Sequence, residues 1–362
     1  MSYYNSKSIL KKSATYSMVF GERSNGKTYA FLKYGLEQYF KNGYQIAYIR
    51  RWKEDIQGKR GSTIFNALIE NGEIERLSKG EFTGIHYYAG KFYLCNYDNG
   101  KAIYNDINIL GYAFALTDVE HDKSTAYPKI ETIIFDEFLT NRLYLPNEFV
   151  IFMNVISTII RRRETPKIFM LGNTVNKFCP YFQEMGLNNI LNMKQGEIDF
   201  YQYGESGLSV AVEYCQTTSK NELKESKKYF AFNNPKLQMI TGGAWELAIY
   251  PHLPAKYKPQ DVLLTFFIEF SDNVFSCEII SIDDMAFIYV HEKTTSIKDP
   301  NAIIYGVDFS PKLNYNRNIF KPKTKVQQRI LHFFKTERVY YQNNSVGDAI
   351  ANYLKTCKVS IL

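Results

Sequence analysis

The chain has little of what would build a disulfide framework or a metal site. Only five of its 362 residues are cysteines, the number is odd, and no two form a CxxC pair. Reduced thiols of a cytosolic protein therefore fit best. The five histidines are scattered with neither HxH nor HxxxH spacing, so we expect no metal site built by the protein alone.

Long apolar stretches are also missing. The N-terminus, MSYYNSKSILKKSATY, lacks the apolar core of a signal peptide, and no uninterrupted apolar run reaches 18 residues. We therefore expect neither secretion nor a membrane span. Apolar residues make up 45% and charged residues 22% of the chain, which excludes a disordered or collagen-like protein. The length suggests two domains.

The positive charge is concentrated near the C-terminus. The whole chain has a net charge of +7, and from Lys312 onwards ten basic residues face two acidic ones. Such an excess attracts phosphate polyanions, although a solvated surface is an equally good interpretation.

The first half of the sequence predicts strands and helices in alternation. The expected elements are strand 16–20, helix 27–41, strand 44–50, strand 131–135, helix 147–163 and strand 167–171. Strand, loop, helix and strand form a βαβ unit, and such units build parallel sheets.

Beyond residue 200 the pattern changes. The expected elements are strand 208–214, a charged helix at 219–232, strands 262–270, 274–281 and 286–290, and helices 326–334 and 345–356. The three successive strands suggest a meander. We therefore expect an α/β domain over residues 1–217, a linker with a helix over 218–254, and a smaller α+β domain over 255–362.

A phosphate-binding loop follows the first strand. The pattern GxxxxGK[ST] is matched in full by Gly21, Glu22, Arg23, Ser24, Asn25, Gly26, Lys27 and Thr28. The two glycines permit backbone angles that turn N–H groups towards a phosphate, and the helix N-terminus adds positive partial charge. We expect Lys27 to reach the β and γ phosphates and the Thr28 hydroxyl to ligate Mg²⁺.

A second motif places two acids at a strand end. The run IIF delivers Asp136 and Glu137 at the sheet edge where ligands bind in open α/β folds. We expect Asp136 to hold Mg²⁺, directly or through water, and Glu137 to polarise the attacking water of ATP hydrolysis. Asp136 follows Lys27 by 109 positions, which leaves room for the extra strands of RecA-like ATPases. Asn173, at the end of the next strand, is expected to sense the γ-phosphate.

Arg161, Arg162 and Arg163 end the predicted helix before that strand. The simpler interpretation is that cations near a helix C-terminus are stabilised by its dipole. The alternative is an arginine finger that reaches the nucleotide of a neighbouring subunit, which can accelerate hydrolysis by about 10³–10⁵.

In this order and spacing, the motifs resemble those of the DNA-packaging ATPases of small phi-29-like tailed phages. The stretches that carry the resemblance are VFGERSNGKTYA, IAYIRRWKED, KSTAYPKIETIIFDEF, YLPNEFV, IIRRRE, LGNTVN and CPYF. The resemblance implies a RecA-like P-loop ATPase of the ASCE class that forms a homopentameric ring at the portal vertex of an empty capsid. Such a ring works in the host cytoplasm and drives double-stranded DNA inwards.

The resemblance also implies roles for single residues. The residues of the two motifs keep the roles given above. Arg161 and Lys123 would act in trans, on the nucleotide of a neighbour. Arg50 and Arg51 would contact the nucleotide or order the site.

For the C-terminal half, the resemblance implies a vestigial RNase H-like nuclease without its metal-binding acids. Glu269, Glu278, Asp283 and Asp284 lie among the predicted strands, and whether they converge on a metal stays open; nuclease activity is not expected. The basic C-terminal segment suits docking to a structural packaging RNA, the portal (connector) protein or DNA. The sequence does not choose among these partners.

Two other functions stay open at this point. A helicase or another nucleic-acid translocase would separate a forked duplex without any capsid. A nucleotide-gated adaptor module at the portal would not hydrolyse ATP even in assembled rings with DNA. The intact set of Lys27, Asp136 and Glu137 argues against the adaptor.

Overall fold

A computed structural model describes residues 4–118, 125–140, 144–176, 178–190, 192–215, 250–253, 256–282 and 285–359. The chain divides into two compact units, one of Met1–Asn141 with Asn147–Trp245 and one of Arg142–Pro146 with Glu246–Leu362. The domain boundaries expected near residues 217 and 254 lie outside the described residues, so they stay a prediction. Among the described helices, none is both long and apolar enough to cross a bilayer.

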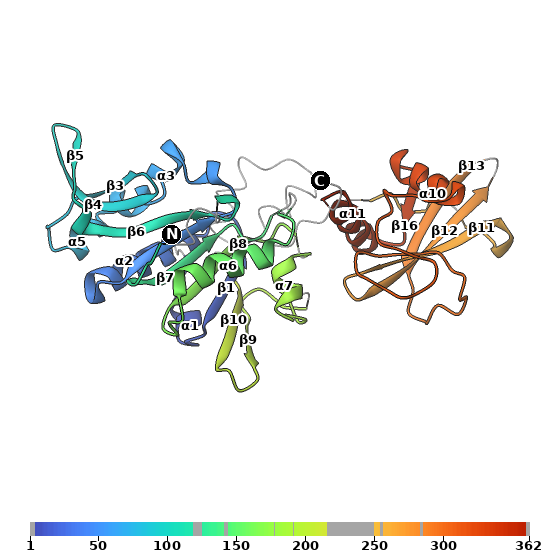
Figure 1. The fold of residues 1–362 in the computed structure, drawn as a ribbon, viewed down its shortest axis with the longest axis horizontal. Coiled ribbons are helices and arrows are strands. Elements are labelled where there is room, and N and C mark those ends of the chain that lie inside the picture. The colour runs from blue at the N-terminus through green and yellow to red at the C-terminus, as the bar shows by residue number, and fades with distance from the viewer. Residues whose placement is uncertain are drawn as a thin grey trace, which may run out of the picture. The chain divides into compact units, whose positions relative to one another are not determined.

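The first unit is built on a ten-stranded sheet in the order β3-β4-β6-β2-β7-β8-β1-β10-β9, with β5 paired to β4 (Figure 1). Its strands are β1 Tyr16–Gly21, β2 Gln45–Arg50, β3 Gly84–Tyr88, β4 Lys91–Asp98, β5 Lys101–Ile103, β6 Ile109–Ala115, β7 Ile130–Asp136, β8 Lys167–Asn173, β9 Ile198–Tyr203 and β10 Leu208–Tyr214. The run from β6 to β10 is parallel throughout, which confirms the expected parallel sheet. The carboxyl ends of β1, β2, β7 and β8 therefore meet at one edge.

Helices connect these strands. Their bounds are α1 Lys7–Leu10, α2 Lys27–Asn42, α3 Gly58–Ser62, α4 Asn66–Glu70, α5 Glu73–Leu77, α6 Glu148–Ile160 and α7 Pro180–Glu184, with 3₁₀ turns η1 Lys53–Asp55 and η2 Asp106–Asn108. Helix α2 ends where Gly43 adopts φ 74° and donates its N–H to the Tyr39 carbonyl. Glycine suits this left-handed cap because it has no Cβ.

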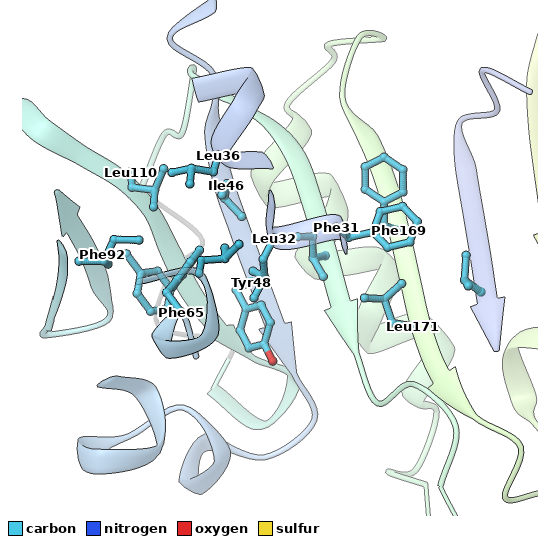
Figure 2. Close-up of a cluster of buried hydrophobic side chains, with 14 of the residues drawn as sticks. Phe31, Leu32, Leu36, Ile46, Tyr48, Phe65, Phe92, Leu110, Phe169 and Leu171 are labelled. Carbon is cyan, nitrogen blue, oxygen red and sulfur yellow. The ribbon is translucent and has the colours of Figure 1, made fainter. Parts of the chain in front are cut away.

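A buried apolar cluster fixes α2 across the sheet (Figure 2). Phe31 of α2 packs on Phe169 of β8 with ring centroids 4.7 Å apart, and Leu36 is completely buried in the same cluster as Ile46 of β2. Each such side chain contributes about 1.5–3 kcal/mol when fully buried. The N-terminus of α2 is thereby held at the carboxyl edge of the strands.

Helix α6 is shorter than the sequence predicts. The predicted helix includes the three arginines up to residue 163, but its last residue in the structure is Ile160. The helix stops because Arg161 and Arg162 have φ angles of 43° and 68°, in the left-handed region. The N–H of Arg161 still bonds to the Ser157 carbonyl and closes the last turn.

The second unit has a six-stranded sheet in the order β15-β14-β11-β12-β13-β16. Its elements are η5 Pro259–Asp261, β11 Val262–Phe270, β12 Asn273–Ile282, β13 Met285–Glu292, β14 Ile304–Tyr305, β15 Tyr315–Asn316, α10 Lys325–Lys335, β16 Val339–Tyr341 and α11 Asn344–Val359. The antiparallel meander of β11, β12 and β13 and both predicted helices are confirmed. The RNase H-like character stays a prediction, and the helix expected at 219–232 lies outside the described residues.

Two of the four acids considered above, Glu269 and Glu278, are engaged in other contacts. Glu269 pairs with Lys312, and Glu278 lies between the Tyr257 hydroxyl and His291. Asp283 and Asp284 fall outside the described residues. Within the part of the chain that the structure describes, no three His, Cys, Asp or Glu side chains are grouped to hold a metal ion.

Candidate nucleotide-binding site

The phosphate loop lies between β1 and α2 and has the backbone that its glycines predict. Gly26 has a φ of 91°, which favours glycine, and Ser24 also has a positive φ of 59°. Gly21 is required for another reason, since a Cβ there would lie 2.9 Å from the Cβ of Cys215 at the end of β10. The neighbouring strand therefore sets the path of the loop as it leaves β1.

Lys27 lies inside this loop and is 6% exposed. Its Nζ donates to the Glu22 carbonyl at 2.6 Å, to Oδ1 of Asn25 at 3.1 Å and to Oδ1 of Asn173 at 3.4 Å. Burial lowers the pKa of this ammonium. Asn173 ends β8, directly opposite Gly21 in the parallel ladder, so the predicted sensor lies beside the loop. The side chain of Arg23 is exposed.

Thr28 and Asp136 come together from elements 108 residues apart. The Thr28 hydroxyl lies 3.2 Å from both carboxylate oxygens of Asp136, and the Tyr48 hydroxyl donates to one of them at 2.8 Å. Asp136 is 8% exposed. A hydroxyl and a carboxylate are hard oxygen ligands of the kind that Mg²⁺ prefers, so these residues fit the predicted cation.

Glu137 faces outward beside this pair. Its φ is 60°, its side chain is 57% exposed, and its Oε2 lies 2.6 Å from Nη2 of Arg50. Arg50 also lies 3.8 Å from Asp136 and 3.5 Å from Asp55. Burial acts to lower the pKa of Arg50, but Tyr48, Asp136 and Glu137 raise it above its ordinary value. The guanidinium therefore stays charged and neutralises part of the acidic cluster.

Arg51 lies beneath the site instead of facing it. It is 4% exposed and holds both oxygens of the buried Glu148, at 2.7 Å and 2.8 Å. It also donates to the main-chain carbonyls of Glu137 at 3.1 Å and Phe138 at 2.7 Å. These contacts favour the alternative that Arg51 orders the site, and its direct contact with the nucleotide stays a prediction.

Three residues of this site were not singled out from the sequence. Glu148 accepts a third hydrogen bond, from the Tyr181 hydroxyl at 2.8 Å, and Tyr48 supports Asp136. Glu148 is the only charged residue in the run EFVIFMNVISTII, and a lone acid that begins such an apolar helix was the available signal. Nothing in the local pattern marks the two tyrosines.

Arg161 lies at the opposite end of the sheet. Its neighbour Arg163 bonds to the carbonyl of Ile130, the first residue of β7, whereas Asp136 is the last. Six residues of strand span about 20 Å, so the exposed Arg161 lies too far away to act on the site of its own chain. Lys123 lies outside the described residues.

Comparison with known proteins places this architecture in a family. The family described as "Podovirus DNA encapsidation protein (Gp16)" matches residues 1–213, which is more than half of the chain. The chain belongs to this family. The resemblance expected from the motifs is thereby confirmed.

Curated relatives and solved structures agree with this membership. The DNA packaging proteins of Bacillus phages phi29 and B103 are each 32% identical to the chain over 183 and 181 residues, or 50% and 49% of it. These alignments cover 49% and 50% of the relatives, so the chain spans about half the length of the curated relatives it matches. Solved structures described as "The bacteriophage Phi-29 viral genome packaging motor assembly" and "The Phi-28 gp11 DNA packaging Motor" match over 98% of the chain. They do so with TM-scores of 0.59 and 0.55 at 20% and 19% identity, and 100% and 98% of those chains are covered. They confirm the predicted α/β fold with a mainly parallel sheet, while the RNase H-like character of the second unit stays a prediction.

Proposed function

We propose that this protein hydrolyses ATP and uses the energy to move double-stranded viral DNA into a preformed capsid. The observation that carries the proposal is the convergence of Lys27, Thr28, Asp136 and Glu137 at one edge of a parallel sheet. Membership in a DNA encapsidation family supports DNA as the cargo. A helicase would have the same site but separate a forked duplex without a capsid.

The phosphate loop supplies the binding groups. Loop N–H groups and the α2 N-terminus would hold the phosphate oxygens, and the Lys27 ammonium would exchange its loop carbonyl partner for them. Thr28 and Asp136 would hold Mg²⁺, which neutralises charge on the β and γ phosphates. Asn173 would report on the γ-phosphate through its contact with Lys27.

Glu137 would orient the attacking water. Its carboxylate lies 2.6 Å from Nη2 of Arg50, which holds it in place, and its oxygens can accept a hydrogen bond from water. Arg51 holds the main chain at Glu137 and Phe138 from below. Arg50 thus orders the side chain and Arg51 orders the backbone that carries it.

Completion of the site would need a second subunit. Arg161 lies near the start of β7, and Asp136 lies at its other end, about 20 Å along the strand. This position favours action in trans, where Arg161 would stabilise charge on the transferring phosphoryl group. We propose the same for Lys123. A closed homopentameric ring would give every site such a neighbour, and an isolated monomer would be a poor ATPase.

The distribution of positive charge in the chain suggests its nucleic-acid and protein partners. DNA gripped through its phosphates would be held without sequence preference and more weakly at high salt. The basic segment from Lys312 onwards suits a packaging RNA, the portal protein or DNA at the portal vertex in the host cytoplasm. We propose no nuclease activity.

The test is steady-state ATP hydrolysis against protein concentration, with and without double-stranded DNA. Wild type should be cooperative and stimulated by DNA. Arg161→Ala and Glu137→Gln should each abolish turnover, and mixing them should restore part of it, because each supplies what the other lacks. A hydrolysis rate that rises linearly with protein concentration, and that changes neither with DNA nor in Arg161→Ala, would refute the ring motor.

A further inference from the structure

The three consecutive arginines after α6 differ in their surroundings. Arg161 and Arg162 are exposed, whereas the side chain of Arg163 turns inward and is 24% exposed. In the sequence they form one basic cluster, and nothing in the local pattern distinguishes the three residues. The structure separates two exposed cations from one that is used inside the protein.

The Arg163 guanidinium bonds to two segments of chain at once. On α6 it donates to the carbonyls of Ile159 at 2.9 Å and Ile160 at 3.1 Å. Its other acceptors are the carbonyls of Tyr127 at 3.0 Å, Pro128 at 3.2 Å and Ile130 at 2.7 Å and the carboxylate of Glu131 at 2.6 Å. All three guanidinium nitrogens are used, and the fork joins the end of α6 to the start of β7.

This junction is what keeps an unfavourable backbone in place. Two successive non-glycine residues, Arg161 and Arg162, have left-handed φ angles. Such conformations persist where the surrounding contacts over-determine them. Arg163 follows directly, and besides its side-chain bonds its N–H donates to the Ile160 carbonyl.

The outer face of α6 leads to the same corner. Its exposed residues are Val150, Met153, Asn154 and Ser157, and the next position on that face is Arg161. The only charged residue of the helix, Glu148, is buried. A helix face without charge is unusual against water but typical of the centre of a protein interface.

We propose that Arg163 is a positioning residue that presents Arg161, at the end of the uncharged face of α6, to a second copy of this chain. The inference rests on the proposed function, since it concerns how the trans-acting arginine is aimed. Arg163 itself touches no nucleotide. Its fork makes the corner rigid, so Arg161 leaves the surface in one direction.

Arg163→Lys is the informative change. Lysine keeps the positive charge but has one nitrogen in place of a planar fork, so it cannot hold both segments. A small misplacement of a catalytic group can cost about 10²-fold in rate. Full-length protein with double-stranded DNA should therefore lose kcat by about that factor, whereas KM for ATP should change less than about twofold.

Mixing separates positioning from general damage. Arg163→Lys subunits keep an intact site, and Glu137→Gln subunits keep a correctly aimed Arg161, so the mixture should recover turnover that neither has alone. Arg162→Lys is the matched control, because it makes the same change on an adjacent exposed arginine, and it should leave kcat unchanged. Turnover of Arg163→Lys equal to wild type would overturn the inference.

Two further outcomes distinguish this inference from the proposed function. If Arg161→Ala is rescued by Glu137→Gln but Arg163→Lys is not, the trans mechanism stands and the positioning role is refuted. If Arg161→Ala keeps full turnover, the proposed function itself fails. Equal losses in the Arg162 and Arg163 variants would show only that the turn tolerates no change, which also refutes the inference.

Discussion

Replacing Glu148 by glutamine should both destabilise the first unit and impair turnover. The Glu148 side chain is fully buried and accepts hydrogen bonds from Arg51 and Tyr181. The amide keeps the shape but removes the negative charge, which leaves the Arg51 cation uncompensated in the interior. Arg51 in turn holds the main-chain carbonyl of Glu137, so the damage should reach the residue that we propose orients the attacking water.

The expected size follows from the burial of both partners. Removing one partner of a buried ion pair costs about 3–5 kcal/mol. For a unit of this size, 1 kcal/mol corresponds to about 2–4 °C, so the melting temperature should fall by roughly 6–20 °C. An exposed pair would contribute only about 0–1 kcal/mol, and the two cases are easily told apart.

The assay combines thermal unfolding with DNA-stimulated ATP hydrolysis. A compensated variant, Arg51→Met with Glu148→Leu and Tyr181→Phe, replaces the buried polar group by apolar side chains and should recover most of the stability. It should not recover turnover, since the donors to the Glu137 and Phe138 carbonyls are gone. Full turnover in the compensated variant would refute the view that Arg51 orders the catalytic loop.

Three further outcomes are expected. Thr28→Ala should raise the Mg²⁺ concentration needed for half-maximal hydrolysis by about tenfold or more, because a ligand oxygen next to Asp136 is lost; an unchanged Mg²⁺ titration would contradict this role. Tyr4→Phe should lower the free energy of unfolding by about 1–3 kcal/mol, because the buried Glu213 loses its hydroxyl donor at 2.6 Å, and adding Glu213→Gln should restore part of it in denaturant titrations. The hydrogen bond to Glu278 raises the pKa of His291 and lowers that of Glu278. The histidine part of the stabilisation is fully present below about pH 6.5 and is lost as pH rises through the raised pKa, while the carboxylate part is lost only as pH falls through its lowered pKa. His291→Asn should therefore flatten the decline of unfolding temperature above about pH 6.5, and a decline equal to that of wild type would count against the pair.

The elements that depend on local pattern could be predicted from the sequence. Strand β1, helix α2 and strand β7 were found within one or two residues, because apolar runs and glycine boundaries act over a few positions. The phosphate loop and the acids of β7 were found for the same reason, since both motifs are short and are defined by residue types at fixed spacing. The end of α6 was predicted wrongly, because no local signal in the three arginines after Ile160 stops a helix. In the structure Arg161 and Arg162 have left-handed φ angles, and Arg163 bonds to the start of β7.

What the sequence by itself determined is which residues form the two motifs: Lys27, Thr28, Asp136 and Glu137 are recognised from their immediate neighbours alone. Only the tertiary structure decided which partners each of the neighbouring arginines Arg50 and Arg51 contacts. Arg50 and Arg51 are adjacent in the chain, but Arg50, the last residue of β2, faces the acids of the site, and Arg51, just after the strand, is buried against Glu148. The partners that distinguish them, Glu137 and Glu148, are 87 and 97 residues away, and no local pattern encodes contacts over that separation.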